Sequence, residues 1–319
     1  MNENSISENT RFGHTSVLPR EVLDLLIVKT GPMKVIDGTV GYGGHSSLIL
    51  KKNAEAVLLG IDRDSEALAA AEKVLSFAND RIHLVKDSFS NLAACAAGLG
   101  WHSVDAILLD LGVSSPKIDN PKRGFSYRLD GPLDMRMDAQ SHETASRILN
   151  KYPYEDLERI FREYGEIQKS RSLADEIVRR RSEKEWMSTA ELADLCNSIP
   201  GIVRRGGPPA PSLCFQALRI EVNNELGELK KALEDGVNLL APGGRIAVIS
   251  FHSLEDRIVK QYFNMMARYC LCPPGLPICM CGHRQSLKPI AKKPVCATED
   301  EIRVNRRASP AKLRVAEKI

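Results

Sequence analysis

Residues 34–45 read KVIDGTVGYGGH, and this stretch decides the fold. Lys34–Asp37 is a short, mostly apolar strand that ends on an acid, and the glycines that follow let the chain turn tightly and approach a ligand closely. A helix is expected over Ser46–Lys52, so its N-terminus lies behind the turn. Asp62 ends the next strand about twenty residues later, where a carboxylate can accept hydrogen bonds from ribose hydroxyls.

The same alternation of strand and helix extends outward from this stretch. Strands ending at the acids Asp62, Asp87 and Asp110 alternate with helices, which is typical of a mostly parallel sheet covered on both faces. The expected strands are Ala56–Ile61, Ile82–Val85, Val104–Leu109 and Arg245–Ser250, and the expected helices include Ser16–Leu26, Ser65–Leu75 and one long helix, Phe215–Leu240.

The alternation is interrupted in the middle of the chain. Residues 117–142 are rich in Gly, Pro and Asp, and residues 153–199 have the apolar spacing of amphipathic helices. We therefore predict a core made of residues 13–116 and 213–319, with an inserted helical domain at 117–212 that recognises the substrate. The polar residues 1–12 are expected to be disordered.

Two cofactor classes fit a glycine-rich turn of this kind. A dinucleotide would place its pyrophosphate at the helix N-terminus, but Asp37 would repel it, whereas the sulfonium of S-adenosylmethionine would be attracted. Asp87-Ser88-Phe89 follows the third strand, where an acid can meet the adenine amino group and Phe89 can cover the ring, although Phe89 could equally belong to the core. The row of acids at the strand ends favours S-adenosylmethionine.

Composition limits the surroundings of the protein. The 319 residues are 43% hydrophobic and 27% charged, and the net charge of +3 allows a nucleic-acid partner without requiring one. No run approaches the ~20 apolar residues that span a bilayer, and the N-terminus lacks a signal pattern. We therefore expect a cytoplasmic protein with no membrane partner.

Three longer motifs make the chain recognisable. They are DLGVSSP at 110–116, DGPLDMRMD at 130–138 and SFHSLEDR at 250–257. With the glycine-rich turn, they closely resemble the bacterial ribosomal RNA small-subunit methyltransferase H family, also called MraW. The resemblance runs from about His14 to Ile319. It implies a class I, Rossmann-like α/β fold and S-adenosylmethionine-dependent methylation of N4 of a cytosine in the decoding region of 16S ribosomal RNA in the small subunit.

The resemblance also implies which residues hold the cofactor. Gly43, Gly44 and His45 match the cofactor loop of the family, Asp62 its ribose-binding acid, Phe89 its adenine-side aromatic residue, and Asp110 a further cofactor-contacting acid. Lys117 stands where the family often has Gln, so only a backbone contact would survive there. Residues 305–310, NRRASP, also depart from the usual Asn-Pro-Arg run of the family.

The reaction requires an aligned amine and an acceptor for its proton. The Asp/Asn-Pro-Pro-aromatic motif of many amino-methylating enzymes is absent, and residues 110–116 take its place after the fourth strand. We therefore expect Asp110, Ser114 and Ser115 to orient the amine, with Asp134 and His252 as second choices. His252 could instead simply begin a helix.

A base inside an RNA helix must be unpaired or flipped out to react, and the phosphates around it require clustered cations. The candidate cations in the insertion are Lys122, Arg123, Arg128, Arg179–Arg181, Arg204 and Arg205, and those near the C-terminus are Arg303, Arg306, Arg307, Lys312 and Arg314. Arg179–Arg181 could equally be a solvated helix face.

Four of the eight cysteines crowd into twelve residues. Cys270-x-Cys272 and Cys279-x-Cys281, with His283 just beyond, could ligate zinc, or they could be reduced thiols in a loop.

Two further interpretations of the whole chain stay open. One is a methyltransferase that acts on another nucleic acid or on protein, and the other is a non-catalytic RNA-binding factor for ribosome assembly.

Overall fold

The computed structural model describes residues 16–274, 276 and 278–319. The predicted disorder of residues 1–12 lies outside these described residues. The chain divides into two compact units. The first runs to Gly112 and resumes at Leu226–Ile319, and the second comprises Val113–Glu225.

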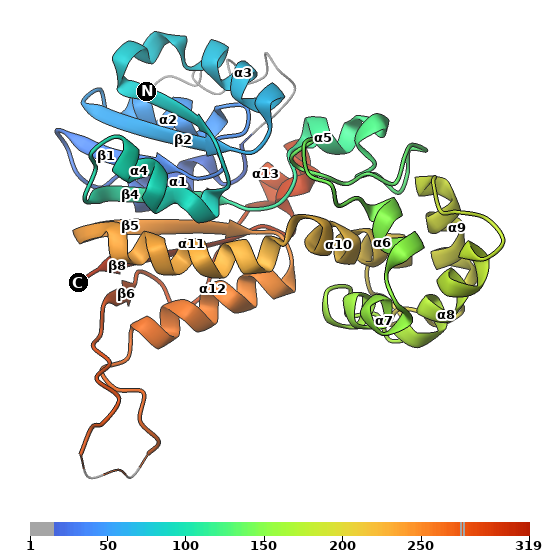
Figure 1. The fold of residues 1–319 in the computed structure, drawn as a ribbon. Coiled ribbons are helices and arrows are strands. Elements are labelled where there is room, and N and C mark those ends of the chain that lie inside the picture. The colour runs from blue at the N-terminus through green and yellow to red at the C-terminus, as the bar shows by residue number, and fades with distance from the viewer. Residues whose placement is uncertain (1–15, 275, 277) are drawn as a thin grey trace. The chain divides into compact units, whose positions relative to one another are not determined.

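The first unit is built on one eight-stranded sheet (Figure 1). Strands β1 to β5 are parallel in the order β3-β2-β1-β4-β5, and β8 then pairs antiparallel with β5 and with β6 and β7. The predicted class I, Rossmann-like α/β sheet is confirmed. The strands are β1 Met33–Asp37, β2 Ala56–Asp62, β3 Ile82–Lys86, β4 Val104–Asp110, β5 Leu240–Ser250, β6 Leu287–Pro289, β7 Val295–Cys296 and β8 Lys312–Lys318.

Both faces of this sheet are buried. Successive residues of a strand point to opposite faces, so Val35 belongs to one apolar cluster and Ile36 to the other. Figure 1 shows helices on both sides of the sheet. They are α1 Pro19–Leu26, α2 Gly44–Lys52, α3 Ser65–Val74, α4 Leu92–Gly98, α11 Glu225–Leu239, α12 Ser253–Met266 and α13 Glu299–Val304, with short 3-10 turns at Ser76–Arg81, Phe89–Asn91 and Arg306–Ala308.

The parallel pairing fixes where the acids lie. Asp37 pairs in register with Gly60 of β2 and Leu108 of β4, so the carboxyl ends of these three strands meet at one edge of the sheet. Asp37, Asp62 and Asp110 are the last residues of their strands. Open α/β sheets bind ligands at this edge.

The second unit is helical around its own core, in which Phe161 and Ile148 are completely buried. Trp186 joins this core and donates its indole N–H to the Ile177 carbonyl at 3.2 Å. The helices are α5 Ser115–Asp119, α6 Ala145–Lys151, α7 Tyr154–Glu163, α8 Ser170–Arg181, α9 Thr189–Ser198 and α10 Ala210–Asn223, with a 3-10 turn at Pro121–Arg123. Among the described residues, no helix combines the length and apolar content needed to cross a bilayer.

The predicted single helix Phe215–Leu240 is wrong. Asn224 has a left-handed backbone (φ 49°, ψ 39°) that ends α10, and a new helix, α11, begins at Glu225. Asparagine tolerates this conformation better than most residues, which makes it a natural helix end. Because Phe215 and Leu218 of α10 lie in the helical core, the second compact unit extends beyond the expected 117–212 to Glu225.

Candidate active site

The Asp37 carboxylate at the end of β1 holds the glycine-rich turn in place through hydrogen bonds. This carboxylate is 1% exposed and accepts hydrogen bonds from the Ser46 hydroxyl (2.6 Å) and the Thr39 amide (3.2 Å). Burial raises the pKa of Asp37 to about 6, since the ionised form loses its hydration and the charge of Asp62 adds to this. Asp37 therefore holds the turn in shape through Thr39 and Ser46.

The glycines of the turn are required mainly by the protein behind them. Gly41 and Gly43 have positive φ (51° and 83°), a conformation that other residues adopt only with strain. A Cβ at Gly44 would lie 2.3 Å from the Ser16 hydroxyl, and one at Gly38 would lie 2.6 Å from the Leu109 side chain. The turn is thus packed closely against neighbouring side chains at Gly38 and Gly44.

Asp62 braces the same turn from the neighbouring strand. One of its oxygens accepts the Gly41 amide at 3.0 Å, and the other accepts the Asp64 amide at 2.8 Å. A carboxylate oxygen can accept more than one hydrogen bond, so these bonds are compatible with ribose hydroxyls as further donors. The predicted cofactor acid therefore lies directly beside the predicted cofactor turn.

The residues after β3 complete this edge. Asp87 accepts the amide of Ser88 (2.7 Å) and the side-chain amide of Asn91 (2.8 Å), which closes a tight turn. Phe89 packs partly against the apolar cluster and borders Gly38, whose Cβ would lie 3.2 Å from that of Phe89. Phe89 thus contacts the core and lies next to the glycine-rich turn. The structure is compatible with both interpretations, as a core residue and as a cover for the adenine ring.

Asp110 is the most unusual acid of the site. Its amide donates to the Thr39 hydroxyl at 2.7 Å, and its side chain, 19% exposed, lies 3.6 Å from Nε2 of His45. Burial, together with the charges of Asp37 and Glu255, raises the pKa of Asp110 to about 8. Among the described residues no hydrogen-bond donor reaches its Oδ1. A ligand that brings a positive charge or an N–H group would satisfy this atom.

His252 caps the start of α12, so the simpler of the two predictions for it, that it begins a helix, is confirmed. Its Nδ1 accepts the Glu255 amide at 3.4 Å, and its Nε2 lies 3.2 Å from the Glu255 carboxylate. Glu255 in turn accepts the His252 amide at 3.3 Å, which completes a capping box, and it also accepts the Phe251 amide at 2.8 Å. Glu255 was not singled out from the sequence, although a Glu three residues into a helix start is the signal for this arrangement.

The remaining catalytic candidates belong to the second unit. Ser114 immediately precedes α5 and Ser115 begins it. No partner for the buried Ser114 hydroxyl is found among the described residues. Lys117 lies in the same helix and is only 8% exposed. Their roles, like the other assignments of site residues, remain predictions.

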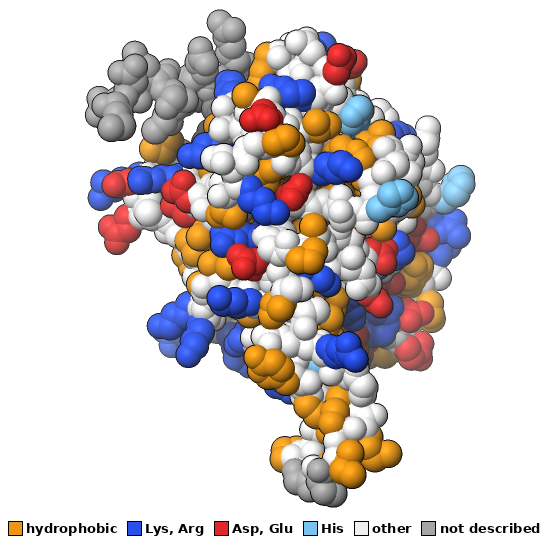
Figure 2. Space-filling view, turned by 90° about the vertical axis from the view of Figure 1, so that its left-hand side faces the viewer, with side chains coloured by type: hydrophobic (Ala, Val, Ile, Leu, Met, Phe, Trp, Pro, Cys, Tyr) orange, Lys and Arg blue, Asp and Glu red, His pale blue; other side chains and the backbone are white. Residues whose placement is uncertain are grey.

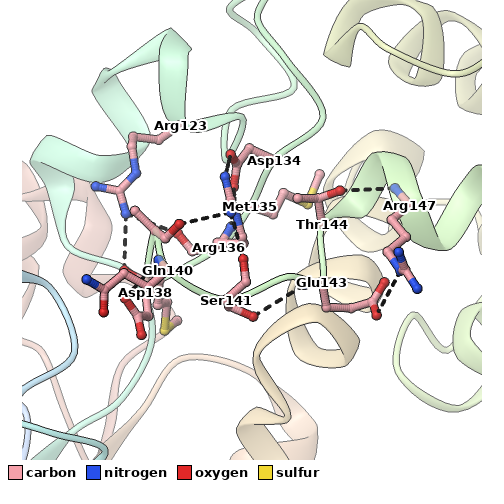
Figure 3. Close-up of polar contacts among 12 residues, drawn as sticks. Arg123, Asp134, Met135, Arg136, Asp138, Gln140, Ser141, Glu143, Thr144 and Arg147 are labelled. Atoms are coloured by element: carbon pink, nitrogen blue, oxygen red, sulfur yellow. Dashed lines mark hydrogen bonds and ion pairs between the residues drawn. The ribbon is translucent and has the colours of Figure 1, made fainter.

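Asp134 is held in a network that makes it a poor proton acceptor (Figure 3). Arg136 donates to both of its oxygens, at 2.8 and 2.7 Å, and also to the carbonyls of Ala139 and Ser141. Burial raises the pKa of Asp134, but the hydrogen bonds and charge of Arg136 more than offset this, so the pKa lies below its usual value. The 130–138 motif therefore fixes a loop.

The predicted cations fall into two groups. Arg179 and Arg180 are paired with Glu176 at 2.7 Å, and Arg181 donates to two backbone carbonyls of its own unit. Near the C-terminus, Arg314 and Lys312 are paired with Asp256, and Arg303 with Asp300. By contrast, five of the predicted cations are exposed and form no ion pair with a carboxylate within 4 Å among the described residues: Lys122, Arg128, Arg204, Arg205 and Arg306.

Known proteins that resemble this chain include rRNA methyltransferases and members of one methylase family. Residues 11–319 match the MraW methylase family. The chain is 49% identical over 312 residues to ribosomal RNA small subunit methyltransferase H of Heliobacterium modesticaldum, with 97% of this chain and 99% of that protein covered. The protein of the same name from Carboxydothermus hydrogenoformans is 48% identical, with 97% and 98% covered. A solved rRNA methylase from Streptococcus thermophilus aligns with a TM-score of 0.41 and 11% identity, over 94% and 93% of the two chains.

Asp62→Ala is expected to weaken S-adenosylmethionine binding by about 1.5–3 kcal/mol, because a charged acceptor for the ribose and for the Gly41 amide is lost. Isothermal titration calorimetry measures this directly. Asp64→Ala is the matched control, since Asp64 caps α3 and lies two residues after Asp62 in the turn that follows β2. Equal affinities for Asp62→Ala and the wild type would remove Asp62 from the cofactor site.

The affinity for S-adenosylmethionine is expected to rise as the pH is raised from about 5 to about 9. Burial raises the pKa values of Asp37 and Asp110 to about 6 and about 8, and a sulfonium nearby favours their ionised forms, so binding releases protons. The same groups make the ligand-free protein less stable as the pH rises through this window, because the folded state must give up protons that it holds more tightly than the unfolded chain.

Calorimetry in buffers of different ionisation enthalpy counts the protons released. S-adenosylhomocysteine is the control, because it carries the same amino acid group but an uncharged sulfur. Equal pH dependence for the two ligands would show that the buried acids do not sense the sulfonium.

Proposed function

Because the chain belongs to the MraW methylase family, we propose that it transfers a methyl group from S-adenosylmethionine to N4 of a cytosine in the decoding region of 16S ribosomal RNA. The methylase class and its cofactor follow from the family. The choice of RNA rests on the names of the relatives that match nearly the whole chain. The choice of N4 and of the decoding region rests on the resemblance of the three motifs at 110–116, 130–138 and 250–257.

The observation that carries the chemical part of the proposal is the environment of Asp110. Cytosine N4 is a weak nucleophile because its lone pair is delocalised into the ring, and it must lose a proton when it gains a methyl group. S-adenosylmethionine supplies the electrophilic methyl group when it is bound. Asp110 adds an acceptor atom without a donor among the described residues, at a strand end where ligands bind.

The raised pKa of Asp110 suits it to this task. A carboxyl group with its ordinary pKa would hold a proton too weakly to take one up near neutral pH, whereas a pKa of about 8 matches the working range. Asp110 is therefore our first choice to orient the N4 amine and to accept its proton. Ser114 and Ser115, which follow it along the chain, are proposed to hold the base through their hydroxyl groups.

We propose that the second unit, Val113–Glu225, recognises the RNA. A paired cytosine cannot enter a cofactor pocket, so the target must be single-stranded or flipped out. The exposed cations Lys122, Arg128, Arg204 and Arg205 are available to phosphates, because none faces a carboxylate among the described residues. Arg128 also lies over the ring of Tyr127, 5.5 Å from its centroid, which supplies a stacking surface.

Asp110→Asn is expected to lower turnover at saturating S-adenosylmethionine by about a hundredfold, the scale of acid–base assistance, because the amide cannot take up the proton. The measurement is kcat on a decoding-region fragment of 16S rRNA or on small subunits. Asp105→Asn is the control, since Asp105 lies at the opposite end of the same strand and binds Lys29. A change confined to cofactor affinity, with kcat largely retained, would reduce Asp110 to an anchor.

The double substitution of Arg204 and Arg205 by Ala is expected to weaken RNA binding and to lower the salt dependence, d log K/d log [salt], by about 1–2, because fewer counterions are released. Replacing Arg179 and Arg180 is the matched control, since carboxylates already neutralise them. S-adenosylmethionine affinity stays unchanged in both. If only the control pair altered the salt slope, the proposed RNA surface would be misplaced.

A further inference from the structure

The segment between α12 and β6, residues 267–286, contains neither helix nor strand in its described part. It leaves the first unit as a long excursion in Figure 1, and its two ends are joined where the Ser286 amide donates to the Met266 carbonyl at 2.9 Å. It contains Cys270, Cys272, Cys279 and Cys281, which the proposed reaction does not use.

The fold brings these four cysteines together. Their sulfur atoms all lie within 4.8 Å of one another. Three of the separations are 3.4 Å (Cys270 to Cys279), 3.7 Å (Cys270 to Cys281) and 3.6 Å (Cys279 to Cys281). Four sulfurs around a tetrahedral zinc ion, at Zn–S distances of about 2.3 Å, are separated by about 3.8 Å. A disulfide would need about 2.05 Å.

Backbone amides support the sulfurs in a reciprocal pattern. The amide of Leu271, between the first two cysteines, donates to Cys281, and the amide of Met280, between the other two, donates to Cys272; both distances are 3.3 Å. The Cys272 amide also donates to Cys270 at 3.4 Å. N–H groups aimed at sulfur stabilise the thiolate form, which is the form that binds metal.

The described part of the segment has no buried apolar residue that could stabilise it in place of a metal. No described residue of 267–286 is buried, and Tyr269, Ile278 and Met280 are 81%, 75% and 83% exposed. Figure 2 shows hydrophobic side chains spread over the outside of this protruding part. A short segment without a core needs a cross-link to hold one conformation.

We propose that Cys270, Cys272, Cys279 and Cys281 bind one structural zinc ion. The four thiolates complete the coordination, so no position is left for water or substrate, and the ion has no part in catalysis. Binding displaces the thiol protons and ties the beginning of the segment to its end. His283 is not a member of the cluster, although its position in the sequence had made it a candidate.

The test is to purify the full chain without a histidine tag, under reducing conditions, and to measure metal by mass spectrometry. We expect one zinc ion per chain. Cys272→Ser and Cys279→Ser should each lose the metal, whereas Cys296→Ser, an exposed cysteine outside the cluster, should retain it. All three should keep S-adenosylmethionine affinity, which shows that they are folded.

Cobalt provides a second readout that does not depend on the variants. After zinc is removed with a chelator, Co²⁺ added to the wild-type chain should give the absorption of a tetrahedral cobalt thiolate, and added Zn²⁺ should abolish it. The proposal is overturned if the reduced chain takes up neither metal while all four thiols react with an alkylating agent. It is equally overturned if the cysteines are joined as disulfides in protein isolated from a reducing cytosol.

Discussion

The hydrogen bond from the Asp110 amide to the Thr39 hydroxyl joins the two halves of the site, because it links the end of β4 to the turn after β1. Around it, burial and the charges of Asp37 and Glu255 raise the pKa of Asp110, so its ionised form is costly unless a positive charge lies nearby. The glycine turn, the Asp62 brace and the capping box of α12 all hold these acids in position. This environment supports the proposal that a sulfonium binds beside these acids.

We propose that the two units have different parts in the methylation of an RNA base. The sheet unit supplies rigid strand ends, where small errors in position would cost rate. The helical unit has its own core and a motif loop in which Arg136 binds Asp134 and two carbonyls. We propose that its exposed cations without a carboxylate partner among the described residues bind phosphates, whereas Arg179–Arg181 of α8 are satisfied within the unit and stabilise it instead.

Much of this could be predicted from the sequence, and the exceptions have physical causes. Strands and their terminal acids were readable because apolar runs and glycines are local signals. The break at Asn224 was missed because the helical periodicity continues across it and one left-handed residue has no periodicity of its own. The partners of Arg181 and the effect of Glu255 on Asp110 depend on tertiary contacts, which no local pattern encodes. The cysteine spacing suggested a metal, but only the fold brings the four sulfurs together.

We propose that this chain methylates a cytosine of 16S ribosomal RNA at N4 through Asp110. Mass-spectrometric mapping of 16S rRNA nucleosides, from cells that lack the protein, tests it most directly. We expect one N4-methyl group in the decoding region to disappear, to return with the wild-type chain, and to remain absent with a folded Asp110→Asn variant. An unchanged methylation pattern in the deletion strain, or full restoration by Asp110→Asn, would contradict the account.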